Sequence, residues 1–319
     1  MYGDIKLFAG TASPDLAQQI GEYLELPMTG RDIVHYPNDN LLVRLQQSVR
    51  GQDCYVIQGT SRPVHRNLME LLITLQTLRL DSAGRITAVI PYLSYARSDK
   101  KDQPRVPIVA RLVADMIEVA GADRYMTLDL HAGQIQGFFS IPGDVLTTFH
   151  ILVDYIKPLC KKLHDPVVVT VDLGFAKRGR NFAERVNTPL ALIEKRRGTK
   201  DAKTEAITLV GNVEGRDVIL LDDEVDTAGS VKNAVELLKK EGARDIYLAF
   251  VHAVLSDPAV ERLASLPLTG IITTDTVPIP LEKKEQLGDK LTILSVAPLL
   301  GEVIKRAHEG RSVGAMFNE

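Results

Sequence analysis

The sequence lacks the features of a disulfide framework, a thiolate metal site or a membrane protein. It has only two cysteines, Cys54 and Cys160, no tryptophan and 5% aromatic residues. Two cysteines this far apart match no metal or redox spacing. No apolar run reaches the ~18 residues needed to span a bilayer. The segment Met1-Tyr-Gly-Asp-Ile-Lys6 lacks the basic and apolar regions of a signal peptide. We therefore expect a cytoplasmic protein.

The charge is nearly balanced, with 38 Lys and Arg against 41 Asp and Glu and a formal net charge of −3. A nucleic-acid binder usually carries a basic excess that neutralises phosphates, so we expect no nucleic-acid partner. The sequence is 45% apolar and 25% charged, as is ordinary for a globular protein. Its 319 residues exceed one typical core, which favours two packed domains.

Short β-branched runs alternate with helical patterns along the whole chain. Near-continuous apolar runs are expected to be strands buried on both faces, and their alternation with helices predicts an α/β fold with parallel sheets flanked by helices. The predicted strands are Ile5–Gly10, Asp53–Gln58, Arg85–Tyr92, Tyr125–Leu130, Val167–Asp172, Leu190–Glu194, Asp217–Leu221, Ile246–Val251 and Ile271–Thr274. The predicted helices include Pro63–Leu80, Pro107–Val119, Ala228–Lys240 and Ala297–His308.

One internal similarity indicates a duplication. The stretches Gly121–Ala132 and Gly242–Ala253 both begin with Gly-Ala and end with His-Ala, and the apolar positions of the helices before them keep the same register. Chance identity at a glycine-rich junction is the alternative. We predict similar domains at residues 1–145 and 146–319, with the last helix packing on either half.

The strongest local signal follows the predicted strand Asp217–Leu221. Two adjacent carboxylates, Asp222 and Asp223, precede the short loop Asp226–Ser230 and then a helix. Small residues, loop N–H groups and a helix N-terminus suit an anion. The carboxylates would repel a phosphate, so they suit the hydroxyls of a sugar whose phosphate lies in the loop. An ordinary helix cap explains Asp226 or Ser230 alone, but not three acids around this turn.

This segment resembles the phosphoribosyl pyrophosphate (PRPP) loop of the phosphoribosyltransferase fold, and residues 5–317 resemble the ribose-phosphate pyrophosphokinase family. The most specific match is Asp129-Leu-His-Ala-Gly-Gln-Ile-Gln-Gly-Phe-Phe139. The other matching stretches are Ser48–Gly51, Asn67–Leu72, Arg85–Tyr92, Tyr95–Arg97, Lys195–Arg197 and Asp222–Ser230. The resemblance implies two phosphoribosyltransferase-like domains. It also implies transfer of the β,γ-pyrophosphoryl group of ATP to the anomeric hydroxyl of ribose 5-phosphate, giving PRPP and AMP for nucleotide biosynthesis.

The resemblance also implies roles for individual residues. Lys195 and Arg197 are the implied catalytic cations, on a loop that closes over the transferring group. The implied ATP-binding residues are Tyr36, Asn38, Asn40, Arg97, Asp99 and His131, with Tyr36 contributed by a neighbouring subunit. The implied ribose 5-phosphate-binding residues are Asp222, Asp223, Asp226, Thr227, Ala228, Gly229 and Ser230. Candidate regulatory residues for phosphate and ADP are Ser48, Arg50, Ser82, Gln136, Asp144 and Ser312.

The implied cofactor is Mg2+, held by His131 and Asp172. A hard ion such as Mg2+ prefers oxygen, so Asp172 is the better ligand of the two and His131 is expected to act partly through phosphate contacts.

Four positions near the implied substrate sites depart from the family pattern. Asn38 and Asn40 stand where carboxylates are usual. Because an amide both donates and accepts, we expect relaxed or altered adenine selectivity. Ser98 replaces a longer Gln, which predicts a weaker nucleotide contact. Phe175 replaces a Gly, which predicts added bulk close to the metal and ribose site.

Two more departures fall in the candidate regulatory site. Asp81 stands where Ala is usual and Gly314 where Ser is usual. A carboxylate near a phosphate pocket repels its ligand, so we predict weak activation by phosphate and weak inhibition by ADP.

Two other functions remain open. One is a catalytically silent, regulatory paralogue, which intact Lys195, His131 and Asp172 argue against. The other is a phosphoribosyltransferase that consumes PRPP, which the Asp129–Phe139 run and the Tyr95–Arg105 loop disfavour. The expected partners are ATP, ribose 5-phosphate and further copies of the chain, since the family commonly forms dimers that build a hexamer. No membrane partner is expected.

Overall fold

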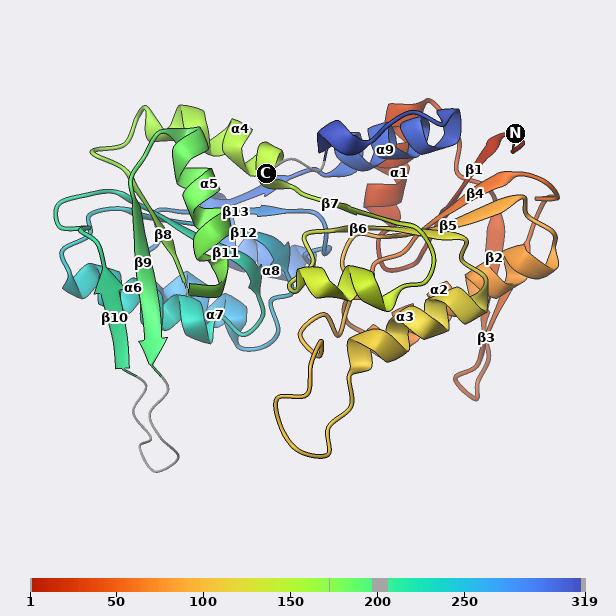
Figure 1. Cartoon of the computed structure of the whole chain (residues 1–319), viewed down its shortest axis with the longest axis horizontal. Coiled ribbons are helices and arrows are strands. Elements are labelled where there is room, and N and C mark those ends of the chain that lie inside the picture. The colour runs from red at the N-terminus through yellow and green to blue at the C-terminus, as the bar shows by residue number, and fades with distance from the viewer. Residues whose placement is uncertain (1, 172, 197–205, 317–319) are drawn as a thin grey trace. The chain divides into compact units, whose positions relative to one another are not determined.

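The structure, a computed structural model, describes residues 2–171, 173–196 and 206–316 (Figure 1). The chain divides into two units. Of the described residues, unit 1 contains those up to Thr147, Thr276–Pro278 and those from Ser295 to Met316. Unit 2 contains Thr148–Asp275 and Ile279–Leu294. The last helix, α9 (Ala297–Glu309), thus belongs to unit 1, where it packs against α1 (Pro14–Leu24).

Unit 1 is built on a parallel sheet. Its strand order is β1 (Ile5–Ala9), β4 (Asp53–Ile57), β5 (Arg85–Ile90), β6 (Arg124–Leu128), β7 (Gly143–Leu146). Helices α2 (Val64–Leu80) and α3 (Val109–Ala120) cover one face, where Leu71, Leu75 and Ile117 are buried against the sheet. Helices α1 and α9 lie on the opposite face (Figure 1).

Unit 2 contains a second sheet in the order β10 (Ala206–Val210), β9 (Leu190–Arg196), β8 (Val167–Thr170), β11 (Val218–Val225), β12 (Ile246–Ala253), β13 (Gly270–Thr274), β14 (Leu291–Leu294). All neighbours are parallel except β10, which is antiparallel to β9. Helices α4 (Phe149–Cys160) and α5 (Ala176–Val186) pack on one face of this sheet. Helices α6 (Gly229–Lys240) and α7 (Ala259–Ser265) pack on the other, and α8 (Leu281–Leu287) contacts α7.

The predicted α/β class, with parallel sheets flanked by helices, is confirmed. The predicted strands leave out β7, β10, β14 and the antiparallel hairpin of β2 (Arg31–His35) and β3 (Leu41–Leu45). β2 mixes charged and apolar residues, so it lacks the continuous apolar run that marks a central strand, and β14 is a four-residue strand at the edge of its sheet. Short 3-10 turns complete the described elements: η1 (Gly133–Phe138), η2 (Leu173–Phe175), η3 (Gly288–Lys290) and η4 (Gly314–Met316).

The two similar stretches of the sequence take equivalent places in their sheets. In unit 1, β6 follows α3 and lies between β5 and β7. In unit 2, β12 follows α6 and lies between β11 and β13. This shared order is what a duplicated α/β unit predicts.

No helix among the described residues is both long and apolar enough to cross a membrane.

Candidate active site

The acidic segment of unit 2 lies on β11 itself, because this strand continues to Val225 rather than ending at the predicted Leu221. Asp222 is half-buried, and Asp223 and Glu224 are only 8% and 7% exposed. The backbone N–H of Asp223 donates to Asp222 Oδ1 at 2.9 Å, which fixes one oxygen of the first carboxylate. The strand therefore presents adjacent acids just before the turn into α6.

The turn into α6 is tight and places backbone donors at its surface. Ala228 has a left-handed backbone (φ 58°) and is the N-cap of α6. Its carbonyl accepts from the N–H of Lys232 at 3.0 Å. Gly229 and Ser230, which belong to both the predicted loop Asp226–Ser230 and the predicted helix Ala228–Lys240, are the first residues of the helix. The first N–H groups of a helix have no partner within it, so they are available to an anion.

Glycine at position 229 is not required by the protein's own packing. A Cβ atom there would lie 3.7 Å from Arg262 Nη1 and 3.8 Å from Thr227 Oγ1, which are ordinary contacts. Gly229 is also not among the glycines with positive φ. A small residue here suits the close approach of a ligand to the backbone, as the sequence suggested for this loop.

Two buried polar residues beside this segment were missed by sequence reasoning. Glu224 pairs in register with His252 of β12, and both are buried, at 7% and 4% exposure. The only sequence signal for His252 is the His-Ala end that it shares with the Asp129–Phe139 run.

The residues Tyr36, Asn38 and Asn40 lie in the exposed turn between β2 and β3 of unit 1. The N–H of Tyr36 donates to the carbonyl of Asn40 at 2.8 Å, and the N–H of Asn40 donates to Asn38 Oδ1 at 3.3 Å. The Asn38 oxygen therefore helps to hold the turn. The Tyr36 ring is 46% exposed, so it is open to a stacking partner.

The loop predicted over Tyr95–Arg105 lacks regular secondary structure, yet it is anchored at several points. Asp99 is buried, at 7% exposure, and Gln134 of η1 donates a hydrogen bond to its carboxylate. Ser98 Oγ accepts from the N–H of Val109 at 3.3 Å, so this serine caps the start of α3. Ser98 thus has a role in the fold. The hydrogen bond between Gln134 and Asp99 joins the loop to the Asp129–Phe139 run.

His131 is exposed and follows β6 by three residues, rather than ending a strand as predicted. Asp129, just before it, is buried and has a positive φ of 38°. Its Oδ1 accepts from Thr147 Oγ1 at 2.9 Å. Asp129 is therefore a structural acceptor that fixes the chain leading to His131.

The predicted catalytic and metal residues are only partly described. Lys195 lies on β9, paired with Ile207 of β10, whereas Arg197 and Asp172 fall outside the described residues. In the part of the chain that the structure describes, no group of three or more His, Cys, Asp or Glu side chains is arranged so that it could hold a metal ion. Mg2+ needs few protein ligands, because it keeps several waters and binds substrate phosphates.

The bulk of Phe175 is taken up by the core. Its ring packs against the cluster that contains Phe149 and Phe182, and the guanidinium carbon of Arg178 lies 5.8 Å from its centre. The effect of Phe175 on the metal and ribose site stays a prediction, because Asp172 lies outside the described residues.

Three of the candidate regulatory residues, Ser48, Arg50 and Ser82, lie close together in unit 1. The N–H of Gly51 donates to the carbonyl of Ser82 at 2.9 Å, Arg50 pairs with Ala83 in an isolated bridge, and Ser48 Oγ accepts from the N–H of Arg50 at 3.4 Å. Asp81 is the C-cap of α2, directly before Ser82. Asp81, whose carboxylate is predicted to repel phosphate, thus lies in the same turn as Ser82, a candidate phosphate ligand.

The other candidate regulatory residues are not joined to this group by any hydrogen bond among the described residues. Asp144 is paired with Arg124 at 2.8 Å, and Ser312 accepts from Arg306 and from the N–H of Gly314. Gln136 is exposed on η1.

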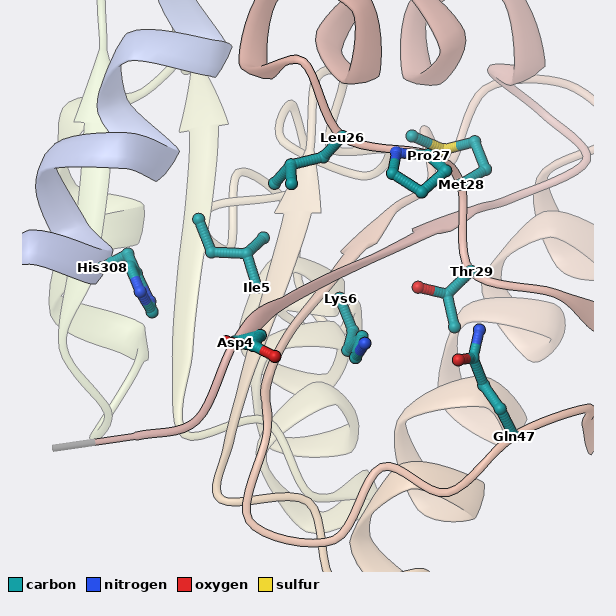
Figure 2. Close-up of a pocket in the computed structure, with 9 residues that line it drawn as sticks. All are labelled: Asp4, Ile5, Lys6, Leu26, Pro27, Met28, Thr29, Gln47 and His308. Atoms are coloured by element: carbon teal, nitrogen blue, oxygen red, sulfur yellow. The ribbon is translucent and has the colours of Figure 1, made fainter.

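A pocket of about 410 Å3 lies beside β1 in unit 1, between Asp4, Lys6, Leu26 and His308 (Figure 2). His308 Nδ1 lies 2.8 Å from Oδ2 of the buried Asp53. The lining contains none of the predicted site residues.

Two family models each match one part of the chain, and individual relatives match nearly all of it. Residues 5–121 match the N-terminal domain of ribose phosphate pyrophosphokinase, and residues 197–318 match the phosphoribosyl synthetase-associated domain. A ribose-phosphate pyrophosphokinase from Caldanaerobacter subterraneus is 47% identical over 98% of both chains. A chloroplastic ribose-phosphate pyrophosphokinase 1 from Arabidopsis thaliana is 44% identical over 98% of this chain and 77% of its own.

A solved structure extends this likeness to the fold. The phosphoribosylpyrophosphate synthetase from Mycobacterium smegmatis superposes with a TM-score of 0.90 at 41% identity, over 96% of this chain and 99% of its own. The resemblance seen in the sequence is therefore confirmed, and the chain belongs to the ribose-phosphate pyrophosphokinase family.

Proposed function

We propose that the protein makes PRPP by transferring the β,γ-pyrophosphoryl group of ATP to the anomeric hydroxyl of ribose 5-phosphate, with release of AMP. The observation that carries this proposal is the strand–turn–helix site at Asp222–Ser230, in a chain that aligns with named pyrophosphokinases over 98% of its length. The hydroxyl oxygen forms a bond to the β-phosphorus, and the bond from that phosphorus to the α,β-bridging oxygen breaks.

The site on β11 and α6 binds and orients the sugar in this proposal. The phosphate of ribose 5-phosphate takes the N–H groups at the start of α6 and the hydroxyls of Thr227 and Ser230. The 2- and 3-hydroxyls donate to Asp222 and Asp223. A sugar held at both ends presents its anomeric hydroxyl in a fixed direction, which is the main contribution that a protein can make to this transfer.

The nucleotide is held by residues of unit 1 and of a neighbouring subunit. Tyr36, Asn38 and Asn40 contact the base, and the anchored loop supplies Arg97 and Asp99 beside His131. Lys195 and Arg197 stabilise the negative charge that develops on the transferring group. We assign Mg2+ as the cofactor, with His131 and Asp172 as its protein contacts, and it neutralises phosphate charge when bound.

We further propose that the chain assembles from dimers into a hexamer, that it is cytoplasmic, and that Ser48, Arg50, Ser82, Gln136, Asp144 and Ser312 contribute to a regulatory site for phosphate and ADP between subunits. Light scattering on the purified protein tests the assembly. A monomer at micromolar concentration contradicts it.

The rival functions are less well supported. A PRPP-consuming transferase does not account for a match to named pyrophosphokinases along 98% of both chains. A silent paralogue does not account for the intact acidic segment and Lys195.

Phosphorus NMR of a reaction with ribose 5-phosphate, Mg2+ and either ATP or GTP separates the three functions. PRPP with AMP is the expected product pair. ADP as the product indicates an ordinary kinase, and no turnover by a folded protein that binds ribose 5-phosphate indicates the silent paralogue. Similar efficiency with ATP and GTP is expected from Asn38 and Asn40, and strict preference for ATP contradicts that part of the proposal.

A further inference from the structure

Arg262 of α7 reaches the turn before α6 from a neighbouring helix. Helix α7 packs beside α6 in unit 2 (Figure 1), and its Val260 and Leu263 are buried in the same core as Val231. Arg262 Nη1 donates to the carbonyl oxygen of Thr227 at 2.8 Å. One arginine thus links a separate helix to the backbone of the proposed phosphate loop.

The carbonyl that accepts from Arg262 belongs to the Thr227–Ala228 peptide, and this peptide sets the direction of the turn. Thr227 directly precedes Ala228, whose left-handed backbone (φ 58°) is uncommon for a residue other than glycine. In a trans peptide the C=O and the following N–H point in opposite directions. When Arg262 holds the Thr227 carbonyl, the N–H of Ala228 is therefore directed away from α7, as a fixed donor of the loop.

The charge of Arg262 has no counter-charge among the acids that the structure describes. Within the described residues no carboxylate lies within ion-pair distance of its guanidinium, whereas the nearby Asp257 pairs with Lys283 at 4.0 Å. Arg262 Nη1 also lies 3.7 Å from the position that a Cβ atom would take at Gly229. A positive charge at this half-buried position adds to the potential of the helix N-terminus toward an anion.

We propose that Arg262 is a positioning residue of the ribose 5-phosphate site, which fixes the Thr227–Ala228 peptide and supplies positive charge beside the phosphate. This inference rests on the proposed function, since the loop must bind a sugar phosphate. Loss of the guanidinium then weakens binding of ribose 5-phosphate and leaves binding of ATP unchanged.

The variants Arg262→Gln and Arg262→Lys test this role, with Arg244→Gln as the matched control. Arg244 directly precedes the start of β12, at the opposite end of the parallel strands from the loop that follows β11, and is half-exposed, with its Nε 3.7 Å from Asp217. For R262Q we expect the KM and the calorimetric Kd for ribose 5-phosphate to rise about tenfold, which corresponds to about 1.4 kcal/mol, with the KM for ATP unchanged. R262K keeps the charge but not the planar fork, so it should fall between wild type and R262Q. R244Q should behave as wild type.

Several outcomes overturn the proposal or its basis. Unchanged affinity of R262Q for ribose 5-phosphate overturns the role of Arg262. A lower thermal midpoint with a reduced kcat and an unchanged KM means that the residue is only structural, and R262K decides the matter if R262Q unfolds. If the wild-type protein neither binds nor turns over ribose 5-phosphate, the proposed function itself fails.

Discussion

Arg85 donates a hydrogen bond to each carboxylate oxygen of Asp53, from Nε to Oδ1 at 2.7 Å and from Nη2 to Oδ2 at 2.5 Å. Asp53 is fully buried and Arg85 is 12% exposed. Tyr55 donates to Asp53 at 3.0 Å, and burial together with this carboxylate raises the pKa of the tyrosine, which keeps it protonated. From α9, His308 contacts Asp53, and the Ala307 carbonyl accepts a hydrogen bond from Arg85. The Asp53–Arg85 pair therefore links the last helix to the sheet of unit 1.

Removing one charge of this pair should destabilise unit 1 strongly. The change Asp53→Asn leaves a largely buried guanidinium without its counter-charge, and breaking a buried pair in this way typically costs about 3 kcal/mol or more. We expect a clearly lower urea midpoint and faster proteolysis of α9. Wild-type stability of this variant would mean that the pair adds nothing to the folded state.

An exposed pair of the same chemistry provides the control. Arg44 and Asp32 lie 2.8 Å apart on the β2–β3 hairpin, with side chains 69% and 36% exposed. Solvent screens such a pair, so Asp32→Asn should leave the urea midpoint unchanged.

The central strands were predictable because their residues are apolar on both faces. β4 and β8 are buried at every position, and the sequence shows an unbroken β-branched run in β8 and an apolar run after Asp53 in β4. The hairpin of β2 and β3 mixes charged and apolar residues, and β10 and β14 are short strands at the two edges of their sheet.

The same distinction applies to the candidate site. The acids and small residues of Asp222–Ser230 are adjacent in the chain, so their chemistry is visible in the sequence. The contacts of Gln134 with Asp99 and of Arg262 with Thr227 each join residues 35 positions apart. No local sequence pattern predicts such contacts, because they form only when two separate elements have packed together.

The two cysteines should be inert in the folded protein. Cys54 is fully buried and Cys160 is 6% exposed. Burial raises the pKa of Cys54 to about 12 and also raises that of Cys160. Since the thiolate is the reactive form, a thiol with a raised pKa stays protonated and unreactive at pH 8. A disulfide exchange reagent at pH 8 should label neither cysteine in the native state and both in guanidinium. Rapid labelling of the native protein would contradict this burial.

Asp81 should weaken activation by phosphate through simple repulsion. Its place at the C-cap of α2, one residue before Ser82, sets a negative charge in the turn that joins Ser82 to Arg50 and Gly51. The change Asp81→Ala should lower the phosphate concentration for half-maximal activation several-fold and strengthen inhibition by ADP. Steady-state rates over a phosphate series measure both effects.

Exposed Asp115 on α3, changed to Ala, is the control for loss of a surface carboxylate. A phosphate response identical in D81A and wild type would remove the regulatory role from this turn.

Lys195 should affect the chemical step far more than substrate binding. It lies on β9 next to the segment that carries Arg197, and the proposed role is to stabilise charge that appears on the phosphoryl oxygens only in the transition state. Loss of one such preorganised donor typically lowers kcat about a hundredfold or more. We expect Lys195→Ala to show this loss with nearly unchanged KM for both substrates, while Lys232→Ala, an exposed lysine of α6 paired with Glu236, keeps full activity. A large rise in KM with kcat preserved would instead mean that Lys195 binds the ground-state substrates, because uniform binding lowers KM without accelerating the reaction.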